Sequence, residues 1–319
     1  MESNKELGGA QTDLNIEEKN SNKIKSKYIL GIIFENLRKK KLLLIIKPNK
    51  RIQNRINISI NDYKEYCEKY SQIEIEIIPN KEKGEFIHFN KKENENYFHI
   101  YFNDNKDEIK RKYLNENDNV KKIKILIDYQ IKSFYELFRY CKCIDSISFP
   151  KFYRTNIENM NGMFYFCSSL KNINLSNVKT DNVTDMSYMF GGCSSLVELD
   201  LTNLNTNNVN KTKGMFLSCT SLKKLNISNF NINKVKNISY MFAECKSLEK
   251  LNISSFNTSN VNNMENMFSG CISLIYLDVS NFVINDNTSV SEMFKECPLE
   301  LLNKIRYQND RLRSKYFFG

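Results

Sequence analysis

Seven of the nine cysteines in this 319-residue chain follow one another at intervals of 26 residues. They are Cys141, Cys167, Cys193, Cys219, Cys245, Cys271 and Cys297. A constant interval over so many positions indicates an internal repeat, which is the signature of stacked repeat architectures. A single repeat of this length cannot bury its own apolar face, so consecutive repeats are expected to stack on one another.

The residues before each cysteine have helical spacing. A phenylalanine lies three residues before every one of the seven cysteines, and a methionine precedes it in all repeats but the first. Counted from Val183 in one repeat, apolar side chains recur at offsets 0, 3, 6, 7 and 10. These offsets keep to one face of a helix. The sequence therefore predicts a short helix in each repeat.

The residues after each cysteine follow a Leu-x-x-Leu-x-Leu pattern, as in Leu196, Leu199 and Leu201. The last step is an alternation, which is typical of a short strand with one buried face. A repeat of this length with this pattern is a leucine-rich repeat. We therefore predict an α/β fold, a leucine-rich-repeat solenoid with a parallel sheet on its concave face and short helices on its convex face.

The run from Asn182 to Leu204 reads Asn-Val-Thr-Asp-Met-Ser-Tyr-Met-Phe-Gly-Gly-Cys-Ser-Ser-Leu-Val-Glu-Leu-Asp-Leu-Thr-Asn-Leu. It resembles the repeat of BspA-like leucine-rich-repeat surface proteins and the related mycoplasma lipoprotein-associated repeats. The resemblance covers roughly residues 131–297. It implies a binding scaffold, often at cell surfaces, and not a particular chemistry.

Four segments follow from these patterns. Residues 1–23 are polar and without periodicity, which predicts a flexible tail. Residues 24–120 change from helical spacing to strand-like alternation, which predicts a small α+β N-terminal domain that caps the solenoid. The 26-residue repeats predict a solenoid over residues 121–297. Residues 298–319 are the expected C-terminal cap, because the open end of a stack exposes its core.

The repeated cysteines are expected to be core residues, since free cysteine is among the most buried residue types. Metal sites need clustered ligands such as Cys-x-x-Cys, and a 26-residue interval supplies one cysteine per repeat. We therefore expect neither a metal nor a cofactor. The predicted structural core of the repeats is Phe164, Cys167, Phe190, Cys193, Phe216, Cys219, Phe242, Cys245, Phe268 and Cys271.

The sequence contains no catalytic motif that we can identify. Its two histidines, His88 and His99, both lie in strand-like runs, and no Gly-x-Ser-x-Gly, phosphate loop or His-Glu-x-x-His is present. We expect a protein that is not an enzyme. The abundance of asparagine, lysine and isoleucine is interpreted as a bias of composition without functional meaning.

The net charge of +10 is carried by the two ends of the chain, because residues 157–297 hold 11 basic and 12 acidic residues. A neutral repeat region argues against nucleic-acid binding. No apolar run is long enough for a membrane span, and the polar start lacks the features of a signal peptide. We expect a cytoplasmic protein, and a cell-surface location is the family-based alternative.

Residues between the buried leucines of each strand should point out from the concave face. The row Glu198, Lys224, Lys250 and Tyr276 varies most from repeat to repeat and would give specificity. We predict a non-catalytic scaffold that recognises protein partners, with the oligomeric state left open. The predicted partner-binding residues are Asn172, Glu198, Asp200, Lys224, Asn226, Lys250, Asn252, Tyr276 and Asp278.

Two alternatives concern the N-terminal region and export. Residues 25–58 faintly resemble the helical F-box segment of ubiquitin-ligase adaptors, although the usual leading Leu-Pro is missing. The basic run Arg38–Lys41 in this segment is interpreted as part of the solvated face of two helices, and contact with nucleic acid, an acidic lipid surface or an acidic partner is the alternative. A surface adhesin is the other alternative, if an export signal has been missed.

Overall fold

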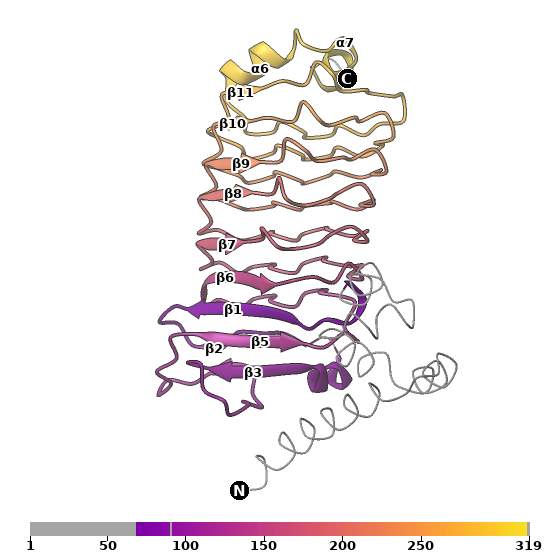
Figure 1. Ribbon diagram of the computed structural model, residues 1–319. Coiled ribbons are helices and arrows are strands. Elements are labelled where there is room, and N and C mark those ends of the chain that lie inside the picture. The colour runs from indigo at the N-terminus through magenta and orange to yellow at the C-terminus, as the bar shows by residue number, and fades with distance from the viewer. Residues whose placement is uncertain (1–67, 90, 318–319) are drawn as a thin grey trace, which may run out of the picture. The chain divides into compact units, whose positions relative to one another are not determined.

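The computed structural model describes residues 68–89 and 91–317 (Figure 1). The chain divides after Cys67, and only the unit that begins at Glu68 is described below. The predicted flexible tail, the predicted N-terminal helices and the F-box-like segment lie outside the described residues. The domain boundaries expected from the sequence therefore stay predictions.

The described part of the chain consists mainly of strands and turns. Its strands are β1 (Ile73–Pro79), β2 (Gly84–Glu85), β3 (Phe98–Phe102), β4 (Tyr113–Leu114), β5 (Ile123–Ile127), β6 (Ile144–Lys151), β7 (Asn172–Asn174), β8 (Glu198–Asp200), β9 (Lys224–Asn226), β10 (Lys250–Leu251) and β11 (Tyr276–Leu277). Its helices are the 3₁₀ turn η1 (Lys92–Tyr97), α6 (Leu299–Ile305), α7 (Asp310–Leu312) and the π-helical turn η2 (Arg313–Phe317).

A five-stranded sheet begins the stack, with the order β3-β5-β1-β6-β7. Strand β1 is antiparallel to both β5 and β6, whereas β6 and β7 are parallel. The Ile-Glu-Ile-Glu-Ile alternation of β1 buries Ile73, Ile75 and Ile77. Strand β5 precedes β6 in the chain, but β1 is inserted between the two in the sheet.

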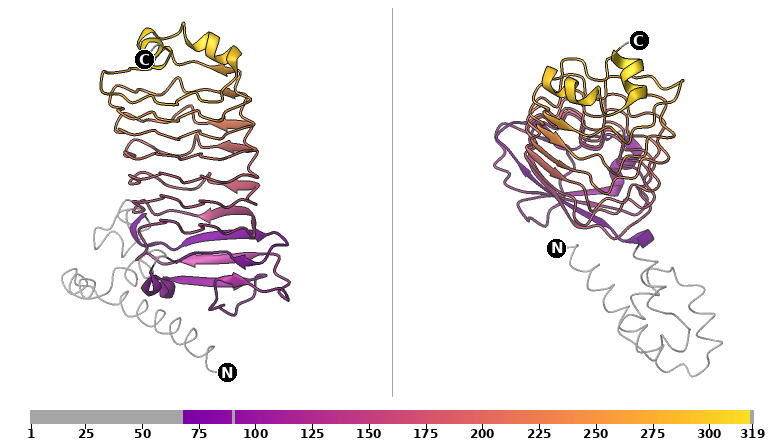
Figure 2. Two further views of the ribbon diagram at one scale, coloured as in Figure 1. Left: turned by 180° about the vertical axis from the view of Figure 1, so that it is seen from behind. Right: turned by 90° about the horizontal axis from the view of Figure 1, so that it is seen from above.

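After β6, every 26 residues bring the chain back beside itself. Parallel pairs join Ser146 to Asn172, Glu198 to Lys224 and Lys250 to Tyr276. Isolated parallel bridges, such as Asn159 with Asp185, repeat this interval on another side of each coil. The coils are therefore superimposed, as the view from above in Figure 2 shows. The parallel strands confirm that part of the predicted fold class.

The predicted short helices on the convex face are wrong. The Met-Phe-x-x-Cys segments form successive tight turns, in which alternate backbone N–H groups bond in two directions. The N–H of Cys141 donates to the carbonyl of Phe138 in its own coil, at 3.1 Å. The N–H of Phe138 donates to the carbonyl of Met163 in the next coil, at 2.9 Å. These bonds between coils take the place of the i to i−4 bonds of a helix.

Residues with positive φ also exclude a helix from these segments. They occur twice in each repeat, five residues and one residue before the cysteine. In one repeat they are Tyr188, with φ of 54°, and Gly192, with φ of 75°. A right-handed helix does not accommodate this conformation. The side chains at offsets 3, 6, 7 and 10 from Val183 still point inward. Each tight turn advances the chain by about three residues, so the same positions return to the inner side.

The phenylalanine ladder runs through the interior of the stack. Its seven rings are those of Phe138, Phe164, Phe190, Phe216, Phe242, Phe268 and Phe294. Neighbouring ring centroids lie 5.5 to 5.8 Å apart, and the rings are inclined by at most 13°. All seven side chains are buried. This offset stacking adds a directional preference to the burial of each ring.

The C-terminal residues close the open end of the stack. The Tyr316 ring meets Phe294, the last ring of the ladder, edge-on at 5.3 Å. Gln308 replaces a further strand beside β11: its Oε1 accepts the N–H of Val279 at 2.9 Å, and its Nε2 donates to the carbonyl of Leu277 at 3.2 Å. Backbone groups at this edge are thus satisfied, which limits edge-to-edge association.

Large side chains on the turns lie over glycines of the following coil. The Phe166 ring covers Gly192, and the Tyr188 ring covers Gly214. A Cβ atom on Gly214 would collide with the Tyr188 ring, and Gly214 itself has a φ of 59°. Glycine is therefore favoured at position 214 by its backbone conformation, which Tyr188 and Tyr240 adopt at a cost in the equivalent positions, and above all by the lack of space for a Cβ atom.

Gly214→Ala is expected to destabilise the protein by about 2 kcal/mol, since it adds overpacking to an unfavourable φ. In a Tyr188→Ala background the same substitution should cost about 1 kcal/mol, because only the backbone penalty is left. Urea unfolding of the four proteins of this cycle measures the difference. An equal cost in both backgrounds would show that the ring does not press on this glycine.

One ion pair fixes the loop before β5. The Arg111 guanidinium binds both carboxylate oxygens of Asp118 at 2.6 Å, and Asp118 also accepts the N–H of Asn115 at 2.5 Å. The hydrogen bonds from Arg111 lower the pKa of Asp118 to about 2. A lowered pKa stabilises the fold above the ordinary value of 3.8, and this contribution disappears as the pH falls toward 2.

Asp118→Asn should therefore lower the free energy of unfolding by about 1 to 2 kcal/mol at neutral pH, with allowance for partial solvent exposure of the pair. The difference between the two proteins should shrink as the pH is lowered from about 5 to about 2. Denaturant unfolding at several pH values measures it. A difference that stays constant over this range would exclude the ion pair as its cause.

Candidate functional site

The row predicted to give specificity lies at the start of four short strands. Glu198, Lys224, Lys250 and Tyr276 are the first residues of β8, β9, β10 and β11. Their side chains are exposed, and the leucine that follows each one is buried. We call the surface formed by these outward side chains the strand face. The alternation of each strand thus places the variable row on the strand face.

A hollow of about 880 Å³ lies on the strand face. All four residues of the variable row line it, and so do the predicted residues Asp200, Asn226, Asn252 and Asp278. The ninth predicted residue, Asn172, lines a second hollow of about 840 Å³. Glu198 belongs to both hollows, which are therefore neighbours.

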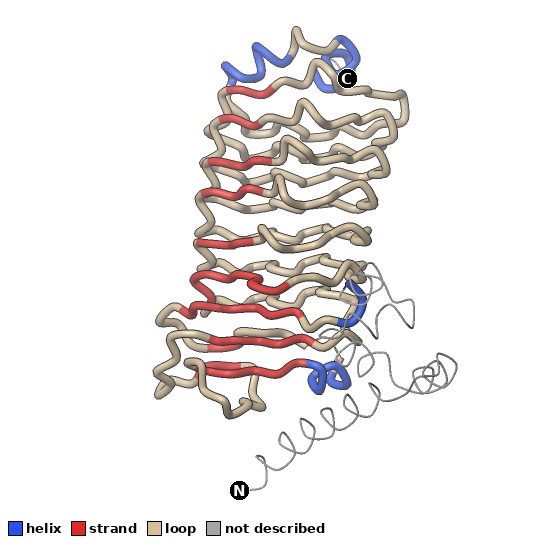
Figure 3. Tube along the Cα trace, in the orientation of Figure 1, coloured by secondary structure: helices blue, strands red, loops and turns tan. Residues whose placement is uncertain are grey.

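Figure 3 shows the short strands one above another along one side of the coils. Both hollows span places where the pairing of these strands is interrupted. Within the described residues, β7 is not paired with β8, and β9 is not paired with β10. Strands of a continuous parallel sheet use their N–H and C=O groups on each other. At these two interruptions the neighbouring strand backbones are not paired with one another.

A second row on the strand face stabilises the turn that follows each strand by accepting the N–H two residues ahead. We call it the turn-holding row; its residues are Asn174, Asp200, Asn226, Asn252 and Asp278. Asp200 Oδ1 accepts the N–H and the hydroxyl of Thr202, at 2.9 and 2.7 Å, and Asp278 contacts Ser280 in the same way. The hydroxyl hydrogen bonds are the main cause that lowers the pKa of Asp200 and of Asp278. These carboxylates have a structural role in the turns, even though they line the hollow.

The variable row has fewer constraints. Lys224 Nζ lies 2.5 Å from Glu198 Oε1, but both side chains are largely exposed, so the pair contributes little to stability. Lys250 forms no ion pair with any residue that the structure describes. The Tyr276 side chain is 59% exposed. A partner could engage these groups without breaking a contact on which the fold depends.

The sequence did not identify the residues that the cap sheet contributes. Glu76 and Ile78 of β1 line the second hollow, and Ile78 is 44% exposed. No pattern in the sequence indicated that β1 pairs with β6. Lys223 and Glu249, which line the first hollow, were also missed. Each lies one position before a residue of the variable row.

The repeated cysteines form a thiol ladder inside the stack. From Cys167 onward, each Sγ donates to the carbonyl of the phenylalanine 29 residues earlier, from Cys167 to Phe138 at 2.8 Å through Cys297 to Phe268 at 3.2 Å. The first thiol, of Cys141, donates to the carbonyl of Arg139 in its own coil at 3.7 Å. Burial raises the pKa of these thiols, for Cys297 to about 12. A protonated, hydrogen-bonded thiol is a poor nucleophile and a poor metal ligand.

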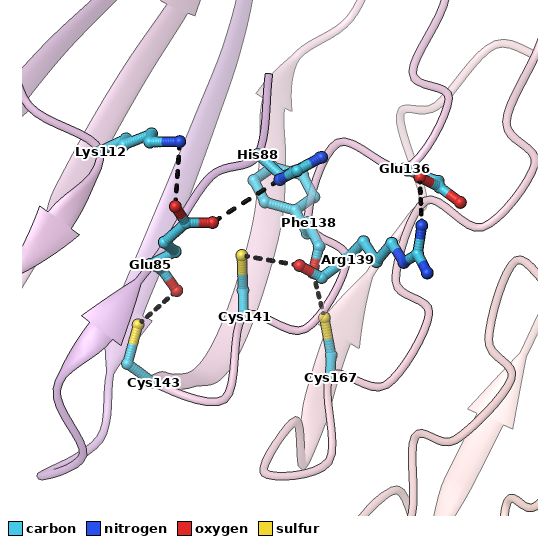
Figure 4. A network of polar contacts seen from close by, with 9 residues as sticks. All are labelled: Glu85, His88, Lys112, Glu136, Phe138, Arg139, Cys141, Cys143 and Cys167. Carbon is cyan, nitrogen blue, oxygen red and sulfur yellow. Dashed lines mark hydrogen bonds and ion pairs between the residues drawn. The ribbon is translucent and has the colours of Figure 1, made fainter. Parts of the chain in front are cut away.

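Figure 4 shows the start of the thiol ladder, beside the ion pairs of Glu85 with Lys112 and of Glu136 with Arg139. Cys143 lies outside the 26-residue interval, and its Sγ donates to the carbonyl of Glu85 at 3.2 Å. The predicted Phe and Cys core residues are all buried. The described residues contain no group of three or more His, Cys, Asp or Glu side chains that could hold a metal ion.

Two family models match this chain. The model described as Mycoplasma protein of unknown function, DUF285, matches residues 132–250 and 219–305, which together exceed half of the chain. The model described as BspA type leucine rich repeat region matches residues 59–182. The chain belongs to the BspA-like leucine-rich-repeat family. This confirms the resemblance seen in the run from Asn182 to Leu204.

Membership of the BspA-like family establishes the repeat class and leaves the partner open. No curated protein and no solved structure matches the chain. Among the described residues, no helix has the length and the apolar character that a membrane crossing requires.

The thiols of the ladder should be unreactive in the folded protein, because burial raises their pKa and each is engaged as a donor. Iodoacetamide at about pH 8 is expected to label Cys193, Cys219 and Cys245 only after denaturation. Mass spectrometry of the cysteine-containing peptides measures this directly. Labelling of these three residues under native conditions, at the rate of a free thiol, would contradict the ladder.

Proposed function

We propose that this protein is a leucine-rich-repeat solenoid scaffold that binds a protein partner through its strand face. The observation that carries the proposal is the convergence of the four most variable outward residues, Glu198, Lys224, Lys250 and Tyr276, on one hollow. The rows that hold the turns and the core are constrained by the fold. Variation at exposed positions of one hollow is what a recognition surface requires.

The chemistry of the hollow favours a protein partner. Tyrosine is enriched among residues that dominate binding energies, and the Tyr276 ring is available on the surface. The charges of Lys223, Lys224, Lys250, Glu198 and Glu249 are of mixed sign around the same hollow. Mixed charges suit the polar rim of a protein interface, whereas a nucleic-acid surface is basic throughout.

We further propose that the scaffold acts by binding and not by catalysis. A general acid or base works best with a pKa near the working pH. The pKa of Asp200 and of Asp278 is lowered by hydroxyl donors in their turns, and burial raises the pKa of the ladder thiols. Both shifts move the pKa away from neutral pH, so Asp200, Asp278 and the ladder thiols are poorly suited to act as general acids or bases.

The test compares two quadruple alanine variants in affinity purification from cells that make the protein. The first variant replaces Glu198, Lys224, Lys250 and Tyr276. The matched control replaces Tyr153, Glu158, Lys179 and Lys236, which are also exposed, carry the same residue types and line neither hollow. A partner that the first variant loses more than about tenfold, and the control retains, supports the proposal.

Retention of every partner by the first variant would contradict binding through this hollow. A third protein without residues 1–60 separates the remaining alternative. If a partner is lost only with this deletion, the N-terminal segment binds it, as the F-box resemblance implies, and the repeats act as a spacer. Equal thermal unfolding of the two quadruple variants excludes a loss of fold as the cause.

A further inference from the structure

We infer that His99 is a proton-dependent clamp on the outermost strand of the cap sheet. His99 belongs to β3, which is at the edge of the five-stranded sheet. Its Nδ1 lies 3.0 Å from Oε1 of Glu108, and its Nε2 lies 3.3 Å from Oδ2 of Asp128. Both ring nitrogens therefore face carboxylate oxygens.

Only the doubly protonated ring satisfies this geometry. An ionised carboxylate accepts hydrogen bonds and cannot donate one, whereas neutral imidazole has one donor and one acceptor nitrogen. The imidazolium donates to Glu108 and to Asp128 at once and forms an ion pair with each. Loss of the proton leaves a nitrogen lone pair opposite one carboxylate and removes both ion pairs.

The other groups around His99 hold the two carboxylates in place. Glu108 Oε1 also accepts from Lys110 Nζ at 2.6 Å, and Asp128 Oδ1 accepts from Gln72 Nε2 at 2.7 Å. The buried guanidinium of Arg154 is electrostatically coupled to Asp128.

The nearest cation of β5 on this face, Lys124, is paired with Glu74 of β1 at 3.1 Å. No other charged group of the described residues is paired with the ring. The protonation state of His99 thus decides whether both of its contacts are attractive or only one of them.

The clamp acts on both edges of β3. On the outer edge, the residue after Glu108 is Ile109, whose N–H donates to the carbonyl of Ile100 at 2.7 Å. On the inner edge, the N–H of Asp128 donates to the carbonyl of Tyr97 at 2.9 Å. Ile100 and Ile109 also line a pocket of about 360 Å³. Loss of the proton is expected to loosen the Ile109 segment and to open this pocket.

The second histidine supplies an internal control. His88 Nδ1 lies 3.6 Å from a single carboxylate, Glu85, and its other nitrogen has no carboxylate partner among the described residues. The chain has two histidines in total. Their ring signals in ¹⁵N NMR can therefore be assigned with one substitution, His88→Gln.

The experiment follows the full chain from about pH 5 to about pH 9, a range that includes the usual titration of histidine. NMR follows both rings, and hydrogen exchange with mass spectrometry follows the peptide that contains Ile109, after correction for the intrinsic pH dependence of exchange. Protection of this peptide is expected to fall several-fold in step with the loss of the His99 proton. Peptides from the coils should show no such change.

His99→Gln should give low protection at every pH and remove the coupled transition, and His88→Gln should leave it intact. Glu108→Gln removes one of the two acceptor charges and should weaken the transition, so it provides the test if His99→Gln does not fold. Titration of His99 without a change in protection of the Ile109 peptide would overturn the inference. So would a transition that persists in His99→Gln.

Discussion

The contact between successive coils on the turn side is the interaction on which the rest of the structure depends. There, backbone N–H groups alternate between their own coil and the next one, as in Cys141 and Phe138. The phenylalanine ladder and the thiol ladder follow the same interval, and each thiol from Cys167 onward adds a hydrogen bond between coils. Because the turn side fixes the spacing of the coils, the strand side can be interrupted without loss of the stack. The hollows of the strand face lie at those interruptions.

The sequence was sufficient to predict the repeat class, the buried rows and the variable outward row, because all three follow from the 26-residue interval and from strand alternation. It did not distinguish a helix from successive turns. Val183, Met186, Met189, Phe190 and Cys193 point inward in either conformation. The distinction depends on hydrogen bonds to the neighbouring coil, which a local pattern cannot contain. The positive φ of Tyr188 was also hidden, because tyrosine gives no sign of it; only the glycines at the equivalent positions 162 and 214 indicate this conformation.

The structural role of asparagine was also missed in the interpretation of the sequence. Its abundance was assigned to composition, but it recurs at corners of the coils. Asn229 Nδ2 donates to the carbonyl of Thr202, 27 residues earlier, at 2.7 Å, and Asn281 donates to the carbonyl of Ser254. A side-chain amide can satisfy a main-chain carbonyl that the turn leaves free.

The position of β1 in the sheet could not be predicted from the sequence either, because its pairing with β6 joins two segments that no repeat pattern relates.

These constraints give the rows of each repeat different structural roles. The inward phenylalanine and cysteine rows are constrained, because each ring stacks on the rings of neighbouring coils and each thiol from Cys167 onward donates to a phenylalanine carbonyl of another coil. The turn-holding row must keep a short polar side chain, because Asp200 and its equivalents accept N–H groups two residues ahead. Only the first outward position of each strand is free of both demands. Under the proposed function, substitution at Glu198, Lys224, Lys250 or Tyr276 would change the partner, while the stability of the stack, which is set on the turn side of the coil, would be conserved.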